Sequence, residues 1–117
     1  MANMKSVNRR DGSTLAEDVE TARGLRGRLI GLIGRADMPP GSAYLITGCR
    51  QIHTFLMRFP IDVIFIDSSG VVVGLEENIS PYRISGCYAA AADTLELPSG
   101  TISSSSVVIG DHLRFDD

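Results

Sequence analysis

The sequence predicts a mainly β domain, either a small β-sandwich or a partly open barrel, with one short helix. Many short segments rich in β-branched residues recur between Gly- and Pro-containing turns, which is typical of such folds. Only one stretch spaces its apolar residues as a helix does. Residues 1–117 are expected to form a single domain, large enough to bury a core without disulfides or metals, with residues 1–4 as a loose N-terminus.

The N-terminal third is expected to hold a hairpin and the short helix. The hairpin spans Lys5 to Val19, because Asp11-Gly12 supplies the positive φ angles of a type I′ turn. The helix spans residues 23–33, where leucines and isoleucines lie at helical spacing. Three glycines in this stretch each weaken the helix by roughly 1 kcal/mol, so the helix should be short.

Residues 49–67, reading CRQIHTFLMRFPIDVIFID, organise the rest of the chain. This stretch gathers a cysteine, a histidine, a methionine and two aspartates onto a run that is otherwise apolar and β-prone. If residues 49–57 are extended, Cys49, His53 and Met57 share one face. Neither face is cleanly apolar, so this strand is expected to be partly exposed or to line a concavity.

Strands are also expected on both sides of residues 49–57. Residues 43–47 precede them, and residues 61–66 follow with β-branched, nearly all-apolar side chains, which predicts a strand buried on both faces. The second of these strands should pair with a return strand from Val71. The remaining expected segments are extended chain over 88–97, a tight turn over 98–100, a polar connector over 103–106 and a strand pair over 107–115.

Charge and composition narrow the function classes. The net charge is −3, with +4 on residues 1–58 and −7 on residues 59–117, which we interpret as two halves that attract each other within one fold. Tryptophan is absent and aromatic residues are few, which argues against nucleic acid as a partner. The sequence contains no apolar run of the ~18 residues that span a bilayer, no signal peptide and no cysteine framework, so we expect a cytoplasmic protein without a membrane partner, a monomer or weak homodimer.

Asp62 is the anomaly of the buried strand. A carboxylate in such a position must be hydrogen-bonded or paired with a cation. Arg35 could neutralise Asp62 or Glu96 through a bidentate pair, and Glu96, flanked by two leucines, should face solvent or Arg35. Alternatively, Arg35 and His53 could hold a small anionic ligand in a pocket near Met57. The candidate ligand-binding residues are Arg35, Cys49, His53, Thr54, Met57, Asp62 and Glu96.

Two kinds of chemistry remain as alternatives. An enzyme could pair Cys49 or Thr54 as nucleophile with His53 as base, although an extended chain places Cys49 and His53 roughly 13 Å apart. Cys87 could approach His53 from another strand. No cofactor is expected, unless the chain bends to assemble a tetrahedral zinc site. The four zinc ligands would be Cys49, His53, Cys87 and His112.

Four blocks of the sequence carry a resemblance. They are GLIGR at 31–35, the 49–67 stretch, LELPSG at 95–100 and IGDHL at 109–113. In this order they resemble the signature blocks of the domain of unknown function 192 family, over about Val7 to Phe115. The resemblance implies a small β-sandwich of jelly-roll type, found mostly in bacteria and archaea, with no established activity. His-Thr-Phe-Leu-Met at 53–57 replaces a Phe-Trp-Met-Lys-Asn run of many members, so the chain resembles a Cys–His subgroup.

We therefore expect a non-catalytic small-ligand or accessory binding module with a pocket around residues 49–62. The first alternative is a Cys/His-dependent enzyme or metal-assisted hydrolase, which would place a thiol near an imidazole nitrogen in an open cleft. The second is a structural partner in a bacterial assembly, which would present an exposed apolar patch.

Overall fold

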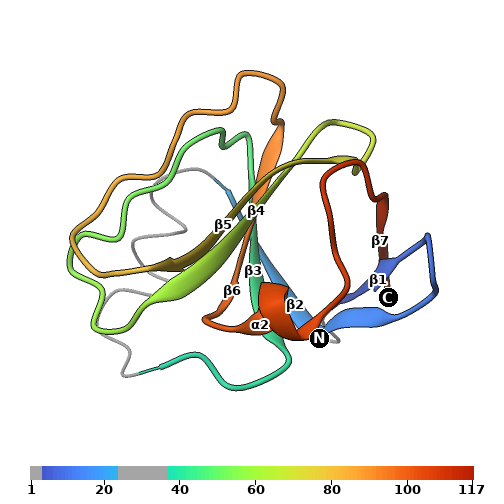
Figure 1. Cartoon of the computed structure of the whole chain (residues 1–117), viewed down its shortest axis with the longest axis horizontal. Helices are drawn as coiled ribbons and strands as arrows, with labels where there is room; N and C mark the ends of the chain where they lie inside the picture. Colours follow the sequence, from blue (N-terminus) through green and yellow to red (C-terminus); the bar gives the residue numbers. More distant parts are fainter. Residues whose placement is uncertain (1–3, 24–36) are drawn as a thin grey trace.

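The computed structural model describes residues 4–23 and 37–117, whose strands form one seven-stranded sheet that curls into a partly open barrel (Figure 1). The strands are β1 (Met4–Asn8), β2 (Thr14–Arg23), β3 (Ser42–Thr47), β4 (Ile61–Ile66), β5 (Val72–Ile79), β6 (Asp93–Pro98) and β7 (Leu113–Asp116). Their order in the sheet is β5-β4-β6-β3-β2-β1-β7, with β2 and β3 parallel and the other paired strands antiparallel. The mainly β class and the partly open barrel are thereby confirmed.

The two edges of the sheet meet at one end of the barrel. Val71 and His112 form an isolated bridge there. The backbone N–H of Leu113 donates to the carbonyl of Gly70 at 2.9 Å. A Cβ atom at Gly70 would lie 2.6 Å from the carbonyl oxygen of Leu113. The φ of Gly70 is 87°, a left-handed conformation that suits glycine. The bonds between the edges satisfy backbone groups that an open sheet would expose.

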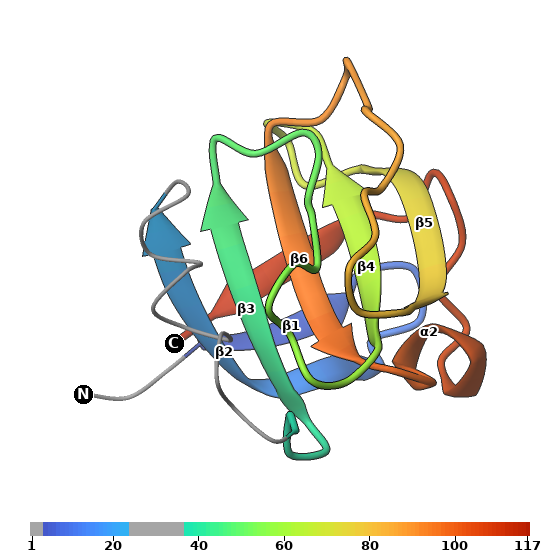
Figure 2. The same cartoon turned by 90° about the vertical axis from the view of Figure 1, so that its left-hand side faces the viewer.

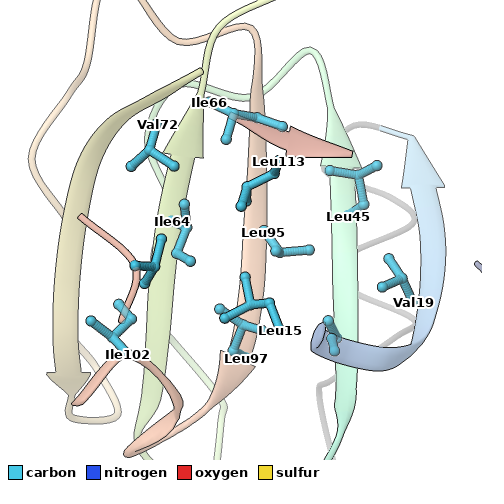
Figure 3. Packing of buried hydrophobic residues seen from close by; sticks show 13 residues of the cluster. Leu15, Val19, Leu45, Ile64, Ile66, Val72, Leu95, Leu97, Ile102 and Leu113 are labelled. Carbon is cyan, nitrogen blue, oxygen red and sulfur yellow. The ribbon is translucent and has the colours of Figure 1, made fainter. Parts of the chain in front are cut away.

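The inner face of the curled sheet buries an aliphatic core (Figure 3). Strand β4 shows why this core forms, since all six of its residues are buried, as the sequence predicted. Ile64 and Ile66 point to the inner face, and each buried side chain of this size contributes about 1.5–3 kcal/mol. The labelled members of the inner core are Leu15, Val19, Leu45, Ile64, Ile66, Val72, Leu95, Leu97, Ile102 and Leu113.

The outer face of β4 and β6 is covered by two long loops, residues 49–60 and 80–92 (Figure 2). Ile52 and Met57 from the first loop pack with Val63 and Phe65 of β4 in a second core. The ring of Tyr88, from the second loop, stacks on Phe65 with the two centroids 4.2 Å apart. The loops therefore belong to the folded body of the protein.

The structure corrects the predicted strand over residues 49–57. This segment is a loop with one isolated bridge, between His53 and Ile84. Its burial does not alternate as a strand's would, because Ile52, Thr54 and Met57 are buried while Phe55 is exposed.

The helix within residues 4–23 and 37–117 lies in a segment that was not predicted to be helical. The predicted stretch 23–33 falls outside the described residues apart from Arg23, which ends β2. The helix that the structure describes is α2 (Thr101–Ser104), which overlaps the expected connector. No helix in the described ranges is both long and apolar enough to cross a membrane.

Two further local predictions are corrected. The N-terminal hairpin is confirmed, but its turn is not type I′, because Gly12 has a positive φ and Asp11 does not. The expected strand pair over 107–115 is reduced to β7, and residues 107–110 are loop and turn.

Candidate functional site

The loops 49–60 and 80–92, called the paired loops below, run side by side over the outer face of the sheet. Backbone hydrogen bonds join them along their length. The N–H of Thr54 donates to the carbonyl of Arg83 at 2.9 Å, and the N–H of Ser85 donates to the carbonyl of Ile52 at 2.9 Å. Further along, the N–H of Tyr88 donates to the carbonyl of Arg50 at 3.0 Å. Each loop thus supplies the hydrogen-bond partners that the other lacks from the sheet.

Thr54 is the junction of the paired loops and has no exposed surface. Its hydroxyl donates to the carbonyl of Ser80 at 2.6 Å and accepts from the N–H of Arg83 at 2.9 Å. Its carbonyl accepts from the N–H of Tyr82 at 2.9 Å and from the N–H of Met57 at 3.3 Å. One buried residue therefore positions a turn in each loop.

Both turns place a bulky residue in the left-handed backbone region. Leu56 has a φ of 65° and Tyr82 a φ of 63°. Each is the third residue of its turn, and in a type II turn this position favours glycine or asparagine. The second position of such a turn favours proline, and Pro81 occupies it in the turn of Tyr82. An L-residue with a Cβ atom pays about 1–2 kcal/mol for this conformation. The hydrogen bonds of Thr54 hold both residues in it.

These turns display an exposed apolar cluster. The rings of His53 and Phe55 lie 5.0 Å apart between centroids, and those of Phe55 and Tyr82 lie 6.4 Å apart. Leu56 and Tyr82 are 58% and 63% exposed, and Ile84, which bridges to His53, is 62% exposed. The N–H of Phe55 donates to Nδ1 of His53 at 3.3 Å, which orients the imidazole. We call these five residues the loop patch.

Positive charge accompanies the loop patch. Arg50, Arg58 and Arg83 are exposed, and neither 49–60 nor 80–92 contains an aspartate or glutamate. The whole chain carries a net charge of −3, so the paired loops are a positive region on an acidic protein.

Four of the predicted site residues lie in the paired loops. Cys49 is half-buried, and its thiol donates to the carbonyl of Gln51 at 3.1 Å. His53 lies in the loop patch, and Thr54 is buried beneath it. Met57 is buried in the second core, on the outer face of the sheet. The Cys49 thiol therefore contacts a carbonyl oxygen, and this hydrogen bond is not made to an imidazole.

The four residues of the zinc alternative are not brought together. His112 lies where the sheet edges meet, bridged to Val71, whereas Cys49, His53 and Cys87 belong to the paired loops. Across residues 4–23 and 37–117, no group of three or more His, Cys, Asp or Glu side chains could hold a metal ion.

Asp62 points away from the paired loops, toward the inner core. Its carboxylate accepts three backbone N–H bonds, from Asn78 at 2.8 Å, Gly100 at 3.1 Å and Ile102 at 2.8 Å. The predicted need of this buried carboxylate for partners is confirmed, and the donors are amides at the end of β5 and the start of α2. These bonds explain why a helical turn forms after Gly100.

Glu96 lies on the outer face of the sheet, in register with Tyr44 and Val63. It is completely buried, so the expectation that its side chain faces solvent was wrong. Its alternative partner, Arg35, lies outside the described residues. The described members of the predicted site are thus divided between the two faces of the sheet, and of those in the paired loops His53 alone belongs to the loop patch.

Sequence reasoning missed four of the five residues of the loop patch, namely Phe55, Leu56, Tyr82 and Ile84. The one local signal was Pro81, which marks a turn, because the contact of Tyr82 with Phe55 depends on the pairing of two loops far apart in sequence.

Hollows occur elsewhere on the described surface. Two, of about 410 and 360 Å³, flank α2 and share Leu15, Thr101 and Ser104. A smaller one of about 90 Å³ lies beside Met38 and Tyr44. The hydroxyl groups near α2 already serve backbone carbonyls, as Ser104 does with Thr101 at 3.2 Å, so these hollows offer little specific recognition.

Comparisons with known proteins support the fold. The model of the DUF192 family, described as "Uncharacterized ACR", matches residues 6–115. A solved structure of a putative transcription regulator from Sinorhizobium meliloti is similar with a TM-score of 0.80 and 28% identity, over 96% of this chain and 91% of that one. A protein of unknown function from Novosphingobium aromaticivorans has a TM-score of 0.78 and 17% identity, over 95% and 82% of the two chains. No curated protein matches the sequence.

Proposed function

Since the chain belongs to the DUF192 family, whose description names no activity, we propose that it is a non-catalytic binding module of the cytoplasm that contacts its partner through the loop patch. Its contact surface is formed by the exposed Phe55, Leu56, Tyr82 and Ile84 together with the half-buried His53. This combines two of the roles expected from the sequence, the binding module and the partner that presents an apolar patch.

The observation that carries this proposal is the conformation of Leu56 and Tyr82. Both are large, well exposed and held at a positive φ, where glycine or asparagine would be unstrained. Such strain persists only where the surroundings over-determine the backbone, and it concentrates at functional sites. Here the surroundings are the hydrogen bonds of the buried Thr54.

Enzymatic alternatives have weaker support. The hydroxyl of Thr54 is buried and already donates to the Ser80 carbonyl, so it is a poor nucleophile. The thiol of Cys49 donates to a carbonyl oxygen. A binding role needs only the exposed side chains.

The similar structure from S. meliloti is called a putative transcription regulator, and this suggests a second role. A regulator that acts through another protein fits the loop patch. Direct DNA binding is less favoured, because the chain has a net charge of −3 and the paired loops carry only three basic residues.

The test uses 8-anilinonaphthalene-1-sulfonate, an aromatic anion, as a probe of the loop patch. We expect NMR titration to shift the amides of residues 53–58 and 80–86, and the double variant Phe55→Ser/Tyr82→Ser to lose this response while keeping its melting temperature. The matched control is Val108→Ser/Ile109→Ser, which removes two apolar residues that are 53% and 63% exposed in another loop. Shifts centred elsewhere, or equal loss in both variants, would contradict the proposal.

A further inference from the structure

We infer that the partner of the loop patch is an acidic polypeptide segment that packs an aromatic or aliphatic anchor against the exposed rings of Phe55 and Tyr82. This inference rests on the proposed function and assigns the chemistry of the partner. It follows from the charge around the patch, the spread of its apolar side chains and the rigidity of the turns that present them.

The charge of the paired loops selects an acidic partner. Arg50, Arg58 and Arg83 are exposed, and the same two segments contain no carboxylate. Guanidinium groups bind carboxylates through paired, geometrically specific hydrogen bonds. The Glu76 carboxylate of β5 contacts the far part of loop 80–92, at Gly86 and Tyr88, whereas Arg58 and Arg83 directly follow Met57 and Tyr82 in the chain. A basic partner would therefore meet like charge beside the loop patch, so the surface discriminates by repulsion as well as attraction.

The apolar residues indicate a polypeptide and not a small anion. Small ligands take concave sites that bury most of their surface. The loop patch instead spreads exposed side chains over two segments, with Phe55, Leu56, Tyr82 and Ile84 between 41% and 63% exposed. Aromatic residues and arginine are the residue types enriched at protein interfaces and at their energetic hot spots.

The presentation of the patch lowers the entropic cost of binding. Thr54 fixes the turns that carry Leu56 and Tyr82, and the contacting, mutually tilted rings from His53 through Phe55 to Tyr82 restrict one another. A surface ordered before contact loses little conformational freedom when the partner arrives.

The experiment uses the full chain and a short synthetic peptide in which Asp and Glu flank a central Leu-Phe pair. Fluorescence anisotropy gives the affinity, and NMR locates the shifted amides. Three further probes are the same peptide with Asn and Gln in place of the acids, the same peptide with a central Gly-Ser pair, and inorganic phosphate. A short single-stranded DNA and sedimentation velocity test nucleic acid and a second copy of the chain.

We expect the acidic Leu-Phe peptide to shift residues 53–58 and 80–86 and to bind more weakly as salt rises. Arg58→Glu/Arg83→Glu should weaken binding about tenfold, because two favourable rim charges become repulsive. The matched control Arg9→Glu/Arg114→Glu makes the same change in net charge on the β1 and β7 side of the barrel, away from the paired loops (Figure 1). It should leave the affinity within about twofold, since screened distant charges contribute little.

Several results would overturn the inference. Equal binding of the uncharged peptide would remove the acidic requirement, and equal binding of the Gly-Ser peptide would remove the anchor. Four further results would each overturn it as well. They are shifts of the same amides by phosphate alone, tighter binding of DNA than of the peptide, a dimer that is lost in Phe55→Ser, and no peptide binding at millimolar concentration. If the aromatic anion still binds the patch in those cases, the proposed function survives, and if it does not, both fall.

Discussion

Thr54 and Arg83 are joined by two reciprocal hydrogen bonds, each 2.9 Å long. The backbone N–H of Thr54 donates to the Arg83 carbonyl, and the backbone N–H of Arg83 donates to the Thr54 hydroxyl. This pair locks together two loops that are distant in sequence. The exposed residues on either side of it therefore have fixed positions in space.

Thr54→Val removes the hydroxyl while keeping the shape of the side chain. The Ser80 carbonyl and the Arg83 N–H then lose their partner, so we expect unfolding free energy to fall by about 1–3 kcal/mol. Thr54→Ser restores the hydroxyl and should recover most of this loss, apart from about 0.8 kcal/mol for the missing methyl group. Urea unfolding measures both variants. A Val variant as stable as the Ser variant would show that the hydroxyl does not hold the turns.

Leu56→Gly separates the strain of the backbone from the contact that the side chain makes. Relief of the positive φ should raise the free energy of unfolding by about 1–2 kcal/mol. The larger conformational entropy that glycine loses on folding should lower it by about 0.5–1 kcal/mol. Stability should therefore stay level or rise slightly, while binding at the loop patch weakens. The control Phe55→Gly, at an ordinary φ, should lower the melting temperature. Loss of stability in both variants alike would argue against strain at Leu56.

Asp62→Ala removes a completely buried carboxylate and leaves three backbone N–H groups without their acceptor. We expect a loss of about 3–5 kcal/mol and faster hydrogen exchange at Ile102 as the start of α2 loosens. Asp62→Asn retains one carbonyl oxygen, so its stability should lie between that of Asp62→Ala and that of the parent protein. Asp67→Ala is the control, because that carboxylate caps an exposed turn through Ser69 and Val71. Equal losses for Asp62→Ala and Asp67→Ala would contradict the special role of Asp62.

The ion pair of Arg10 and Asp111 makes stability depend on pH in the acid range. The Arg10 guanidinium donates to Asp111 at 2.8 Å and, against the opposing effect of burial, holds the pKa of Asp111 down to about 2, below its ordinary 3.8. Because its pKa is lower in the folded state than in the unfolded chain, Asp111 stabilises the protein at pH values above its ordinary pKa. This contribution is lost as pH falls from about 4 to about 2.

Asp111→Asn should therefore have a lower melting temperature than the parent protein at neutral pH, and the difference should shrink toward about pH 2. Arg10→Gln removes the main cause of the low pKa and should flatten the acid dependence in the same way. Thermal melts between about pH 7 and about pH 2 measure this. A gap that stays constant across that range would show that Asp111 does not titrate differently on folding.

Local pattern was enough to predict several strands and turns. The β-branched run of β4 has no polar face other than Asp62, so it had to be buried on both sides, and it is. The turn at Gly70 and the turn at Gly100 follow from residues that tolerate a positive φ, at 87° and 95°. The prediction that Asp62 needs partners followed from the cost of burying a bare carboxylate.

The error over residues 49–57 has a physical cause. Its apolar and polar residues read as a strand, but the sheet beside it was already complete, with β4 paired to both β5 and β6. The segment took its hydrogen bonds from residues 80–92 instead. Local propensity carries no information about which partner is available.

The amino-acid sequence alone determined the mainly β class, the positions of most strands along the chain, the hairpins and the family resemblance, because these depend on neighbours a few residues apart. Tertiary structure alone decided that Thr54 binds the backbone of residues 80–83, that Leu56 and Tyr82 are held in strained turns, and that Asp62 begins a helix 40 residues away. Those relationships depend on which distant segments meet, and the hydrogen bonds that create them exist only once the sheet has closed.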